Sequence, residues 1–278
     1  MTLEFFNGSV SFMNILIIGG DRRMNVAKSE LESKGYKVGS IGLEKNDSGD
    51  IQGAEVVLLP VPSTRDGKNI FCPQSDKVIP LDYINNANDK ALILCCGYSF
   101  KNKDCIDYLN LDDFCLLNAV PTAEGAIAHA ICDTPFCLWK SRVLVIGCGR
   151  VAKILTHRLN AFKCDVTVSA RKPADFAYLD ALNIKHIHTN DVPIKAQNFD
   201  IIFNTVDADI FKGNLKELEH CYLYDLSTKG CIDFDETLAK NLNAVKLPGI
   251  PGKTAPITAG KIIAQTVDQL IGEWKCKI

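Results

Sequence analysis

A run of four apolar residues leads directly into a small-residue motif near the middle of the chain. Residues 143–146 read Val-Leu-Val-Ile, and residues 147–152 read Gly-Cys-Gly-Arg-Val-Ala, a G-x-G-x-x-A pattern. Gly147 permits a tight turn, Gly149 lets a pyrophosphate approach the backbone, and Ala152 lets a following helix pack close to a sheet. The N–H groups that open this helix would bind the phosphates. The motif therefore predicts a dinucleotide site.

The end of the next strand indicates which dinucleotide binds. A site for NAD usually places Asp or Glu there, about 20 residues after the first glycine, to bind the ribose 2′-hydroxyl. Residues 168–172 read Val-Ser-Ala-Arg-Lys, without a carboxylate. Arg171 can contact a 2′-phosphate through two N–H groups or stack on adenine, and Ser169 can donate a hydrogen bond. The pattern favours NADP, although Arg171 and Lys172 also fit two solvated surface cations.

Small polar residues follow two later strands, where ligands bind in open α/β sheets. Asn204 and Thr205 would meet the nicotinamide ribose or its amide, although such turn residues are also ordinary after a strand. The residues expected to bind the cofactor are Gly147, Gly149, Arg150, Val151, Ala152, Ser169, Ala170, Arg171, Lys172, Asn204, Thr205, Val206, Asp225, Leu226, Ser227, Pro248 and Gly249.

Apolar runs that alternate with helical patterns predict an α/β fold with two Rossmann-like, doubly wound parallel sheets and an interdomain cleft. Strands are expected at residues 14–18, 36–41, 54–59, 91–95, 114–117, 143–146, 165–169, 184–188, 200–204, 221–225 and 244–247. Helices are expected at residues 22–34, 149–161, 173–182 and 255–274, and a rigid loop at 248–252.

The two predicted units share a register. Residues 15–19 (Ile-Leu-Ile-Ile-Gly) align with residues 143–147 (Val-Leu-Val-Ile-Gly), which places Asp21 opposite Gly149. A charged side chain there would obstruct and repel a pyrophosphate. The second unit is therefore expected to bind the nucleotide, and the first to supply the substrate side of the cleft.

This division predicts two domains and a C-terminal helix. Residues 13–120 form an N-terminal substrate or partner domain, and residues 121–254 form an NADP-binding domain that is entered by a linking helix at 121–132. Residues 255–275 form a C-terminal helix that packs back across the domains.

The whole-chain composition argues against several classes of protein. The formal net charge is −2, so no basic surface for nucleic acid is expected. No apolar run approaches the about 18 residues of a membrane span, and residues 1–12 lack the basic start and apolar core of a signal peptide. The twelve cysteines are scattered without a C-x-x-C pair, which predicts reduced thiols and no metal site.

With these motifs the chain resembles the dipicolinate synthase A-subunit family of spore-forming bacteria, over nearly its whole length from Met13. The resemblance rests on residues 18–22 (IGGDR), 121–125 (PTAEG), 147–150 (GCGR), 204–205, 225–227 and 248–260 (PGIPGKTAPITAG). The last block is the most distinctive, because a generic Rossmann enzyme would not carry it. The architecture is similar to that of D-2-hydroxyacid dehydrogenases and adenosylhomocysteinase.

The resemblance implies a reaction and a partner. The A-subunit of that family works with a flavoprotein-like B-subunit of dipicolinate synthase to convert dihydrodipicolinate, a diaminopimelate-pathway intermediate, to pyridine-2,6-dicarboxylate during sporulation. The chain would then be an NADP-dependent oxidoreductase of the mother-cell cytoplasm that acts on a small dicarboxylate. Neither nucleic acid nor a membrane is expected as a partner, and a homo-oligomer is left open.

The two carboxylates of such a substrate call for cations or N–H donors. Arg22 and Arg23 lie at a strand-to-helix turn, Ser63 and Thr64 follow a neighbouring strand, and Thr122 lies at the start of an expected helix whose N–H groups would add donors. The two arginines also fit the simpler interpretation of exposed first-turn cations.

Glu124 is the candidate proton acceptor, or alternatively a capping partner for the start of its helix. Two other functions are considered. D-2-hydroxyacid dehydrogenases use a catalytic histidine late in the cofactor unit and an arginine after the strand near Asp225. A D-2-hydroxyacid-type NAD(P) dehydrogenase is therefore disfavoured, because residues 225–235 contain no arginine and no histidine follows His220. A non-catalytic dinucleotide-binding subunit stays open, because no residue of the chain is required to be catalytic.

Overall fold

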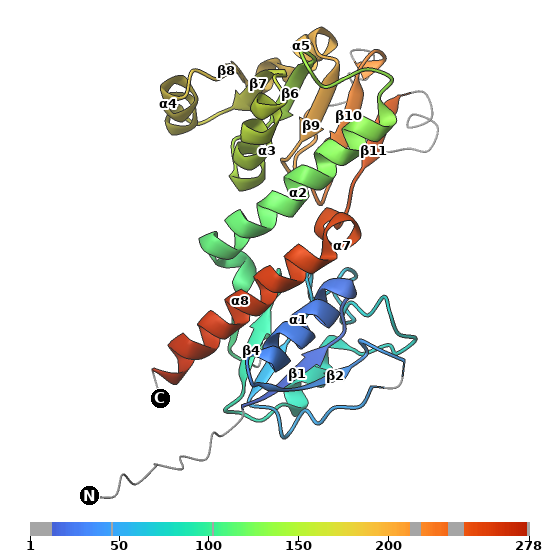
Figure 1. Ribbon diagram of the computed structural model, residues 1–278, viewed down its shortest axis with the longest axis vertical. Coiled ribbons are helices and arrows are strands. Elements are labelled where there is room, and N and C mark those ends of the chain that lie inside the picture. The colour runs from blue at the N-terminus through green and yellow to red at the C-terminus, as the bar shows by residue number, and fades with distance from the viewer. Residues whose placement is uncertain (1–12, 46, 102, 212–217, 233–241, 277–278) are drawn as a thin grey trace, which may run out of the picture. The chain divides into compact units, whose positions relative to one another are not determined.

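The computed structural model describes residues 13–276 except 46, 102, 212–217 and 233–241. The chain divides into two compact units (Figure 1). Unit 1 comprises Met1–Phe114 together with Pro256–Ile278, and unit 2 comprises Cys115–Ala255. The last helix thus belongs to the unit formed by the first part of the chain.

Unit 1 contains a parallel five-stranded sheet in the order β2-β1-β3-β4-β5. Its strands are β1 (Asn14–Ile18), β2 (Lys37–Ile41), β3 (Val56–Leu58), β4 (Leu92–Cys95) and β5 (Cys105–Asp107). Helices α1 (Arg22–Ser33) and α8 (Pro256–Lys275) lie side by side, and short 3-10 helices cover Leu81–Asn86 and Tyr108–Asn110 (Figure 1).

Close packing of α8 on α1 depends on a small residue. A Cβ atom added at Gly260 would lie 2.5 Å from the Arg23 carbonyl oxygen and from the Val26 side chain. Asp268 adds polar contacts, because its carboxylate accepts hydrogen bonds from Lys34 at 2.5 Å and from the Tyr36 hydroxyl at 2.7 Å. Unit 1 is therefore closed by a helix that comes from the far end of the chain.

Unit 2 contains a parallel six-stranded sheet in the order β11-β10-β9-β6-β7-β8. Its strands are β6 (Arg142–Ile146), β7 (Asp165–Ala170), β8 (Lys185–His188), β9 (Ile201–Asn204), β10 (Tyr222–Asp225) and β11 (Asn243–Lys246). Its helices include α3 (Arg150–Ala161), α4 (Pro173–Ala181), α5 (Val192–Lys195) and α7 (Ile250–Thr254), with 3-10 turns at Thr189–Asp191 and Ala196–Asn198. The strand order reverses between β6 and β9, which is where ligands bind in such sheets.

Most of the expected elements are confirmed, with ends that differ by one or two residues. The strand expected at residues 114–117 is wrong, because Asp112–Asp133 forms one helix, α2. Pro121 lies inside α2, where it removes one N–H donor and crowds the carbonyl oxygen four residues earlier, yet the helix continues on both sides of it. Two packed faces keep the helix intact: Phe114 lies against Tyr108 in unit 1, and Ala123 and its neighbours are buried in unit 2.

The start of α2 also corrects the placement of Thr122. Its expected position at a helix N-terminus is wrong, because α2 begins at Asp112. The Thr122 hydroxyl donates a hydrogen bond to the Asn118 carbonyl oxygen at 2.8 Å, as is common inside helices. Backbone N–H groups near Thr122 are thus interior helical donors, and the argument for an anion site there no longer holds.

Two further differences concern short elements. Strand β5 has no counterpart among the expected strands, because Cys105–Asp107 is only three residues long and partly exposed, which leaves no apolar run to detect. The rigid loop expected at residues 248–252 is wrong in its second half, since α7 begins at Ile250 after Gly249 adopts a left-handed conformation with φ of 67°.

Helix α2 is long and apolar enough to pass a length-and-composition test for a membrane span. Core helices of globular proteins pass the same test. Ala123, Ala126 and Ala130 of α2 are fully buried and pack with Val143 and Val145 of β6. This packing assigns the apolar face of α2 to the core of unit 2.

Candidate dinucleotide-binding site

The turn after β6 has the geometry that its glycines predict. Gly147 has φ of 103°, a region that residues with a side chain rarely adopt. A Cβ atom at this position would lie 2.7 Å from both the Thr205 hydroxyl and a Val206 methyl group. Glycine is therefore required at residue 147 for β6 to turn past the end of β9.

The start of α3 is open. Gly149 is the N-cap residue, and a Cβ atom built there has no neighbour within 4 Å. No side chain among the described residues caps this helix. An uncapped N-terminus carries backbone N–H donors and partial positive charge, which suits a phosphate group. Space and charge at Gly149 therefore both fit a pyrophosphate.

A cavity of about 210 Å³ lies beside this turn. Its lining joins the turn (Gly147, Cys148 and Gly149), the segment after β7 (Ala170, Arg171, Lys172 and Asp175) and residues after β8 and β9 (Thr189, Val206, Ala208 and Ile210). The structure thus brings together three segments that the sequence assigns to one site. Sequence reasoning missed Asp175, Thr189, Ala208 and Ile210, although the positions of the last three just after strand ends were a usable signal.

The cations at the cavity are exposed. Arg171 and Lys172 form no ion pair with any other described residue, and Asp175 lies on the same wall in the first turn of α4. Cys148 is half-buried, and its pKa is raised by burial and by the Asp175 charge, with Lys153 acting in the opposite direction. The Cys148 thiol is therefore neutral at neutral pH, and the positive charge at the cavity comes from Arg171 and Lys172.

Ser169 and Thr205 support the turn from inside the unit. The Ser169 hydroxyl is fully buried, and it accepts a hydrogen bond from the Gly147 N–H at 3.3 Å and lies 3.3 Å from the Thr189 hydroxyl. The Thr205 hydroxyl donates to the Ile146 carbonyl oxygen at 2.8 Å. Both hydroxyls hold strand ends together.

Asn204, Asp225 and Ser227 form a buried polar network where β9 and β10 end. The Asp225 carboxylate accepts hydrogen bonds from the Asn204 amide at 3.0 Å and from the Ser227 hydroxyl at 2.6 Å. It also accepts from the backbone N–H groups of Ser227 and Cys231 at 2.9 and 2.7 Å. These groups satisfy one another, so the network fixes the two loops.

Asp207 ties the same loops closer to the surface. Its carboxylate accepts hydrogen bonds from the backbone N–H groups of Thr228 and Lys229 at 2.6 and 2.8 Å. Sequence reasoning gives Asp207 no role, because its partners lie in a different loop. The segment after β9 is thereby held against the segment after β10.

Pro248, Gly249 and Leu226 do not line the cavity. Gly249 is instead the N-cap residue of α7, and α7 packs on α2: a Cβ atom at Gly125 of α2 would lie 2.2 Å from Ile250. Glu124 of α2 forms an ion pair with Arg158 of α3 at 3.2 Å, and both side chains are partly exposed.

The corresponding turn of unit 1 is filled by its own side chains. Asp21 is the N-cap of α1, and its carboxylate accepts a hydrogen bond from the Arg23 backbone N–H at 3.1 Å. The Arg23 guanidinium is 4% exposed and donates two hydrogen bonds of 2.8 Å to Asp21 and another to the Val61 carbonyl oxygen. Arg22 is exposed, so it is the arginine whose charge faces solvent.

Ser63 and Thr64 also have partners within unit 1. The buried Ser63 hydroxyl accepts from the Cys96 N–H at 2.7 Å and donates to the Pro60 carbonyl oxygen at 3.4 Å. The Thr64 hydroxyl donates to Asp66 at 3.1 Å. The structure therefore places these two hydroxyls and Arg22 on the same unit, while Thr122 and Glu124 lie on unit 2.

The chain also covers the glycines of the first turn. The Gly20 N–H donates to the Phe71 carbonyl oxygen at 2.7 Å. A Cβ atom at Gly19 would lie 2.7 Å from the same oxygen and from the Cys72 sulfur. The segment that contains Phe71 and Cys72 thus occupies the space where a phosphate would approach.

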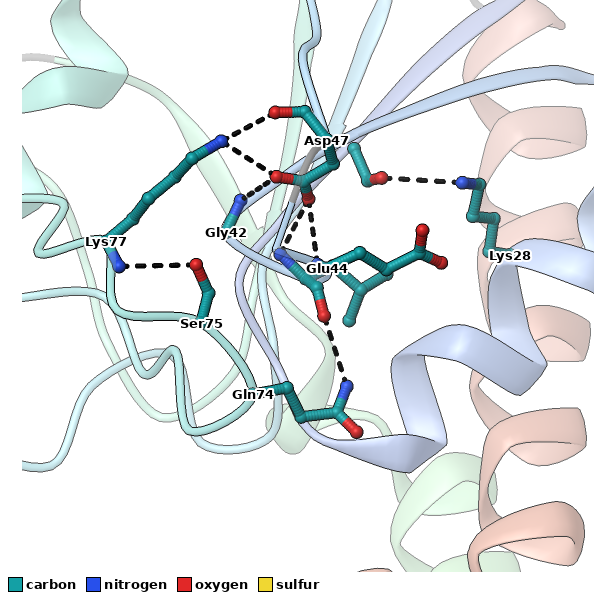
Figure 2. Close-up of polar contacts among 9 residues, drawn as sticks. Lys28, Gly42, Glu44, Asp47, Gln74, Ser75 and Lys77 are labelled. Atoms are coloured by element: carbon teal, nitrogen blue, oxygen red, sulfur yellow. Dashed lines mark hydrogen bonds and ion pairs between the residues drawn. The ribbon is translucent and has the colours of Figure 1, made fainter.

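The loop after β2 of unit 1 is closed by another carboxylate. Asp47, whose side chain is 4% exposed, accepts hydrogen bonds from the backbone N–H groups of Gly42, Leu43 and Glu44 at 2.8–3.1 Å and from Lys77 at 2.9 Å (Figure 2). Burial by itself would raise the Asp47 pKa, but the hydrogen bonds from Lys77 and the backbone outweigh it and lower the pKa to about 2. Unit 1 therefore supplies its own anion at this loop.

Comparisons with known proteins agree with this architecture. Residues 14–112 match the family described as the N-terminal domain of the dipicolinate synthase A-subunit. The chain is 25% identical over 288 aligned positions to the dipicolinate synthase A-subunit of Bacillus subtilis, covering 94% of this chain and 96% of that protein. The crystal structure of the dipicolinate synthase A-subunit from Bacillus halodurans is similar with a TM-score of 0.81 and 26% identity, covering 93% of this chain and 97% of that one.

A more distant likeness concerns the fold alone. The apo-structure of D-lactate dehydrogenase from Escherichia coli aligns with a TM-score of 0.60 and 14% identity over 95% of this chain and 97% of that one. The predicted fold class, two parallel-sheet α/β domains of the D-2-hydroxyacid dehydrogenase type, is confirmed. The predicted resemblance of the chain to the dipicolinate synthase A-subunit family is therefore confirmed, by the family model over residues 14–112 and by the two relatives over nearly the whole chain.

Proposed function

We propose that this chain is the dinucleotide-binding subunit of a dipicolinate synthase, and that it oxidises dihydrodipicolinate to pyridine-2,6-dicarboxylate with NADP. The observation that carries the proposal is the open start of α3 at Gly149, which shares a cavity with Arg171 and Lys172. The similarity to the dipicolinate synthase A-subunit supplies the substrate class.

Different residues would bind different parts of NADP. The backbone at Gly147–Gly149 and the first turn of α3, which contains Arg150, Val151 and Ala152, would bind the pyrophosphate. Arg171 and Lys172 would bind the 2′-phosphate. Asn204, Thr205, Asp225 and Ser227 would hold the loops on which the nicotinamide end rests. Bound NADP supplies the hydride acceptor, and formation of the aromatic pyridine ring drives the oxidation.

In unit 1, we assign the substrate carboxylates to Arg22 and to donors near Thr64. Arg22 is exposed at the start of α1, while Arg23 and Ser63 are buried and hydrogen-bonded within unit 1, which suits a supporting role. Carboxylate recognition by a guanidinium is strong when it uses two N–H groups. Replacement of Arg22 should therefore raise the KM for the substrate and leave NADP binding unchanged.

Glu124 is the proposed proton acceptor. Its ion pair with Arg158 would hold the carboxylate in place. A Glu124→Gln variant should lower kcat by about 100-fold, as is typical for loss of a general base, with NADPH affinity unchanged. Glu273→Gln, which changes an exposed carboxylate of α8, is the control and should keep full turnover. Equal turnover of the Glu124 variant and the control would remove Glu124 from the mechanism.

A flavoprotein-like B-subunit of dipicolinate synthase, a role in sporulation and a mother-cell cytoplasmic location complete the proposal. The decisive assay mixes the purified chain, dihydrodipicolinate and NADP, with and without this partner, and measures NADPH at 340 nm. Formation of NADPH and pyridine-2,6-dicarboxylate in equal amounts supports the proposal. Turnover of an unrelated 2-hydroxy acid by the chain alone would instead favour a D-2-hydroxyacid dehydrogenase, and nucleotide binding without any turnover would favour a non-catalytic role.

A further inference from the structure

The last residues of four neighbouring strands in unit 2 form a row along the carboxyl edge of the sheet. Strand register places Ile146 of β6 beside Asn204 of β9, and Asn204 beside Asp225 of β10. Asp225 in turn lies beside Lys246, the last residue of β11. Register partners in a parallel sheet point to the same face, which is why the Asn204 amide can donate a hydrogen bond of 3.0 Å to the Asp225 carboxylate. Lys246 therefore continues a row that starts next to the turn at Gly147.

The ammonium group of Lys246 reaches the loop that follows β10. A Cβ atom built at Gly230 would lie 3.7 Å from Lys246 Nζ and 3.5 Å from Asp225 Oδ2. The loop is fixed at this point, because Gly230 is buried, has φ of 104° and donates its N–H to the Ser227 hydroxyl at 3.1 Å. The ammonium group therefore lies at the carboxyl edge of the sheet, where ligands bind in such folds.

Lys246 has no anionic partner in the part of the chain that the structure describes. The nearby Asp225 carboxylate forms no ion pair with it, and both oxygens of that carboxylate already accept hydrogen bonds, from Asn204, from Ser227 and from the Cys231 backbone N–H. Lys246 is also partly buried, so its ammonium group has lost some of its water without gaining a contact in return. A ligand carboxylate at this position would supply that contact and would form a charge-assisted hydrogen bond.

We propose that Lys246 binds one carboxylate of the dicarboxylate substrate from the side of unit 2. This inference rests on the proposed function, because hydride transfer requires the substrate ring to lie against the nicotinamide. Asn204 and Asp225 would hold the loops on which the nicotinamide end of NADP rests, and Lys246 ends the next strand of the same row. Its cation would add to the donors assigned in unit 1 and would fix the orientation of the ring.

The first test measures binding of pyridine-2,6-dicarboxylate and of pyridine-2-carboxylate to the full chain saturated with NADPH, by calorimetry. The single carboxylate of the second acid is expected to take the Arg22 guanidinium, which can donate two N–H groups. Lys246→Met keeps the length of the side chain and removes its charge. The variant should bind the dicarboxylate about 10- to 100-fold more weakly, the range for loss of a charged hydrogen bond, and should bind the monocarboxylate as the parent does. An unchanged ratio of the two affinities would overturn the assignment.

Turnover separates failure of this assignment from failure of the proposed function. In the assay with dihydrodipicolinate and NADP, Lys246→Met should raise the KM for the substrate and leave NADPH affinity unchanged. A parent chain that turns over the substrate, together with a Lys246→Met variant of equal KM, would overturn the assignment of Lys246 alone. A parent chain that neither binds the dicarboxylate nor turns over dihydrodipicolinate would overturn the proposed function and this assignment together.

Two further variants and the melting temperature distinguish substrate binding from a structural role. Lys246→Arg keeps the cation and should retain most of the preference for the dicarboxylate. Lys163→Met changes an exposed lysine beyond the end of α3 and should bind both acids as the parent does. Because the Lys246 ammonium group has no anionic partner among the described residues, ligand-free Lys246→Met should melt close to the parent. A lower melting temperature with equal loss of affinity for both acids would show that Lys246 supports the Asp225 loop instead, and would overturn the assignment.

Discussion

The two units begin with the same strand–turn–helix element and use it in opposite ways. In unit 1 the N-cap of α1 is Asp21, whose carboxylate binds the Arg23 backbone and guanidinium. In unit 2 the N-cap of α3 is Gly149, which no side chain among the described residues caps. A helix N-terminus attracts an anion in either case. Unit 1 provides that anion from its own chain, and in unit 2 no described side chain occupies the position.

The same contrast holds at the ends of the second strands. After β2, the Asp47 carboxylate binds three backbone N–H groups and Lys77 (Figure 2). After β7, Arg171 and Lys172 are exposed beside the cavity. Internal carboxylates thus close the turns of one Rossmann-like sheet, while the other has an uncapped helix start and two exposed cations beside a cavity.

The largest expected effect comes from making the second turn resemble the first. Gly149→Asp would place a carboxylate at the start of α3, where it would cap the helix and repel the pyrophosphate. NADPH affinity measured by calorimetry should fall by at least about 100-fold, since a charge-assisted contact is lost and a like charge is added. Gly272→Asp is a matched control, because that helical glycine of unit 1 also has open space. Unchanged NADPH binding by Gly149→Asp would contradict the contrast between the capped turn of unit 1 and the open turn of unit 2.

A smaller effect is expected at the end of β7. Arg171→Asp removes the cation proposed for the 2′-phosphate and supplies the acid typical of an NAD site. The ratio of NADPH to NADH affinity should fall by about 10- to 100-fold, the range for loss of a charged hydrogen bond. Arg171→Lys keeps the charge and should retain most of the preference. If both affinities stay the same in Arg171→Asp, the 2′-phosphate assignment fails.

At the Asp47 loop the expected effect is on stability and its pH dependence. The Asp47 pKa is lowered from its ordinary value of 3.8 to about 2 in the folded state. At pH values between these two pKa values, the unfolded state therefore binds more protons than the folded state. The stabilisation, about 2 kcal/mol from this shift, is present above pH 4 and is lost as the pH falls through 2. Denaturant unfolding of Asp47→Asn should show a lower free energy of unfolding at pH 7 and a flatter dependence between pH 4 and 2.

Asp89→Asn serves as the control for that measurement. Asp89 pairs with Lys103 but is fully exposed, so the change should alter the free energy of unfolding little. A loss for Asp47→Asn no larger than for Asp89→Asn would show that the loop does not depend on its internal anion.

The smallest expected change in nucleotide binding follows from Asp21→Gly. This variant places glycine where Gly149 stands in the second turn, yet it should not create a second NADPH site. The Phe71 carbonyl oxygen already accepts the Gly20 N–H, and Cys72 fills the space above Gly19. Titration should give one NADPH per chain in both proteins. A second site in Asp21→Gly would show that Asp21 alone keeps the nucleotide out of unit 1.

The open turn was predictable because its chemistry is local. Strand, glycine turn and helix are adjacent in sequence, and the positive φ of Gly147 is a local requirement of the turn between them. Asp21 carried a second local signal, since Asp is a preferred N-cap residue, and this indicates an internal role for its carboxylate as well as an obstruction. The position of most strands followed from the apolar pattern.

The remaining features depend on contacts between distant residues. Asp47 meets Lys77 across a loop, and Phe71 reaches back to Gly20. No spacing rule connects these pairs. The helical conformation of Pro121 could not be predicted either, because it also depends on distant residues. Burial of the alanine face of α2 in the core of unit 2 outweighs the cost of the proline. The sequence therefore predicted the open turn of unit 2 better than it predicted how unit 1 closes the equivalent turn.

Amide hydrogen exchange with and without NADPH tests the central claim most directly, because it reports on both turns in one experiment. The expected result is NADPH-dependent protection of residues 147–152 and 170–172, with no change at residues 19–24. Protection at residues 19–24, or its absence at residues 147–152 when NADPH is bound, would contradict the assignment of the open turn to the nucleotide.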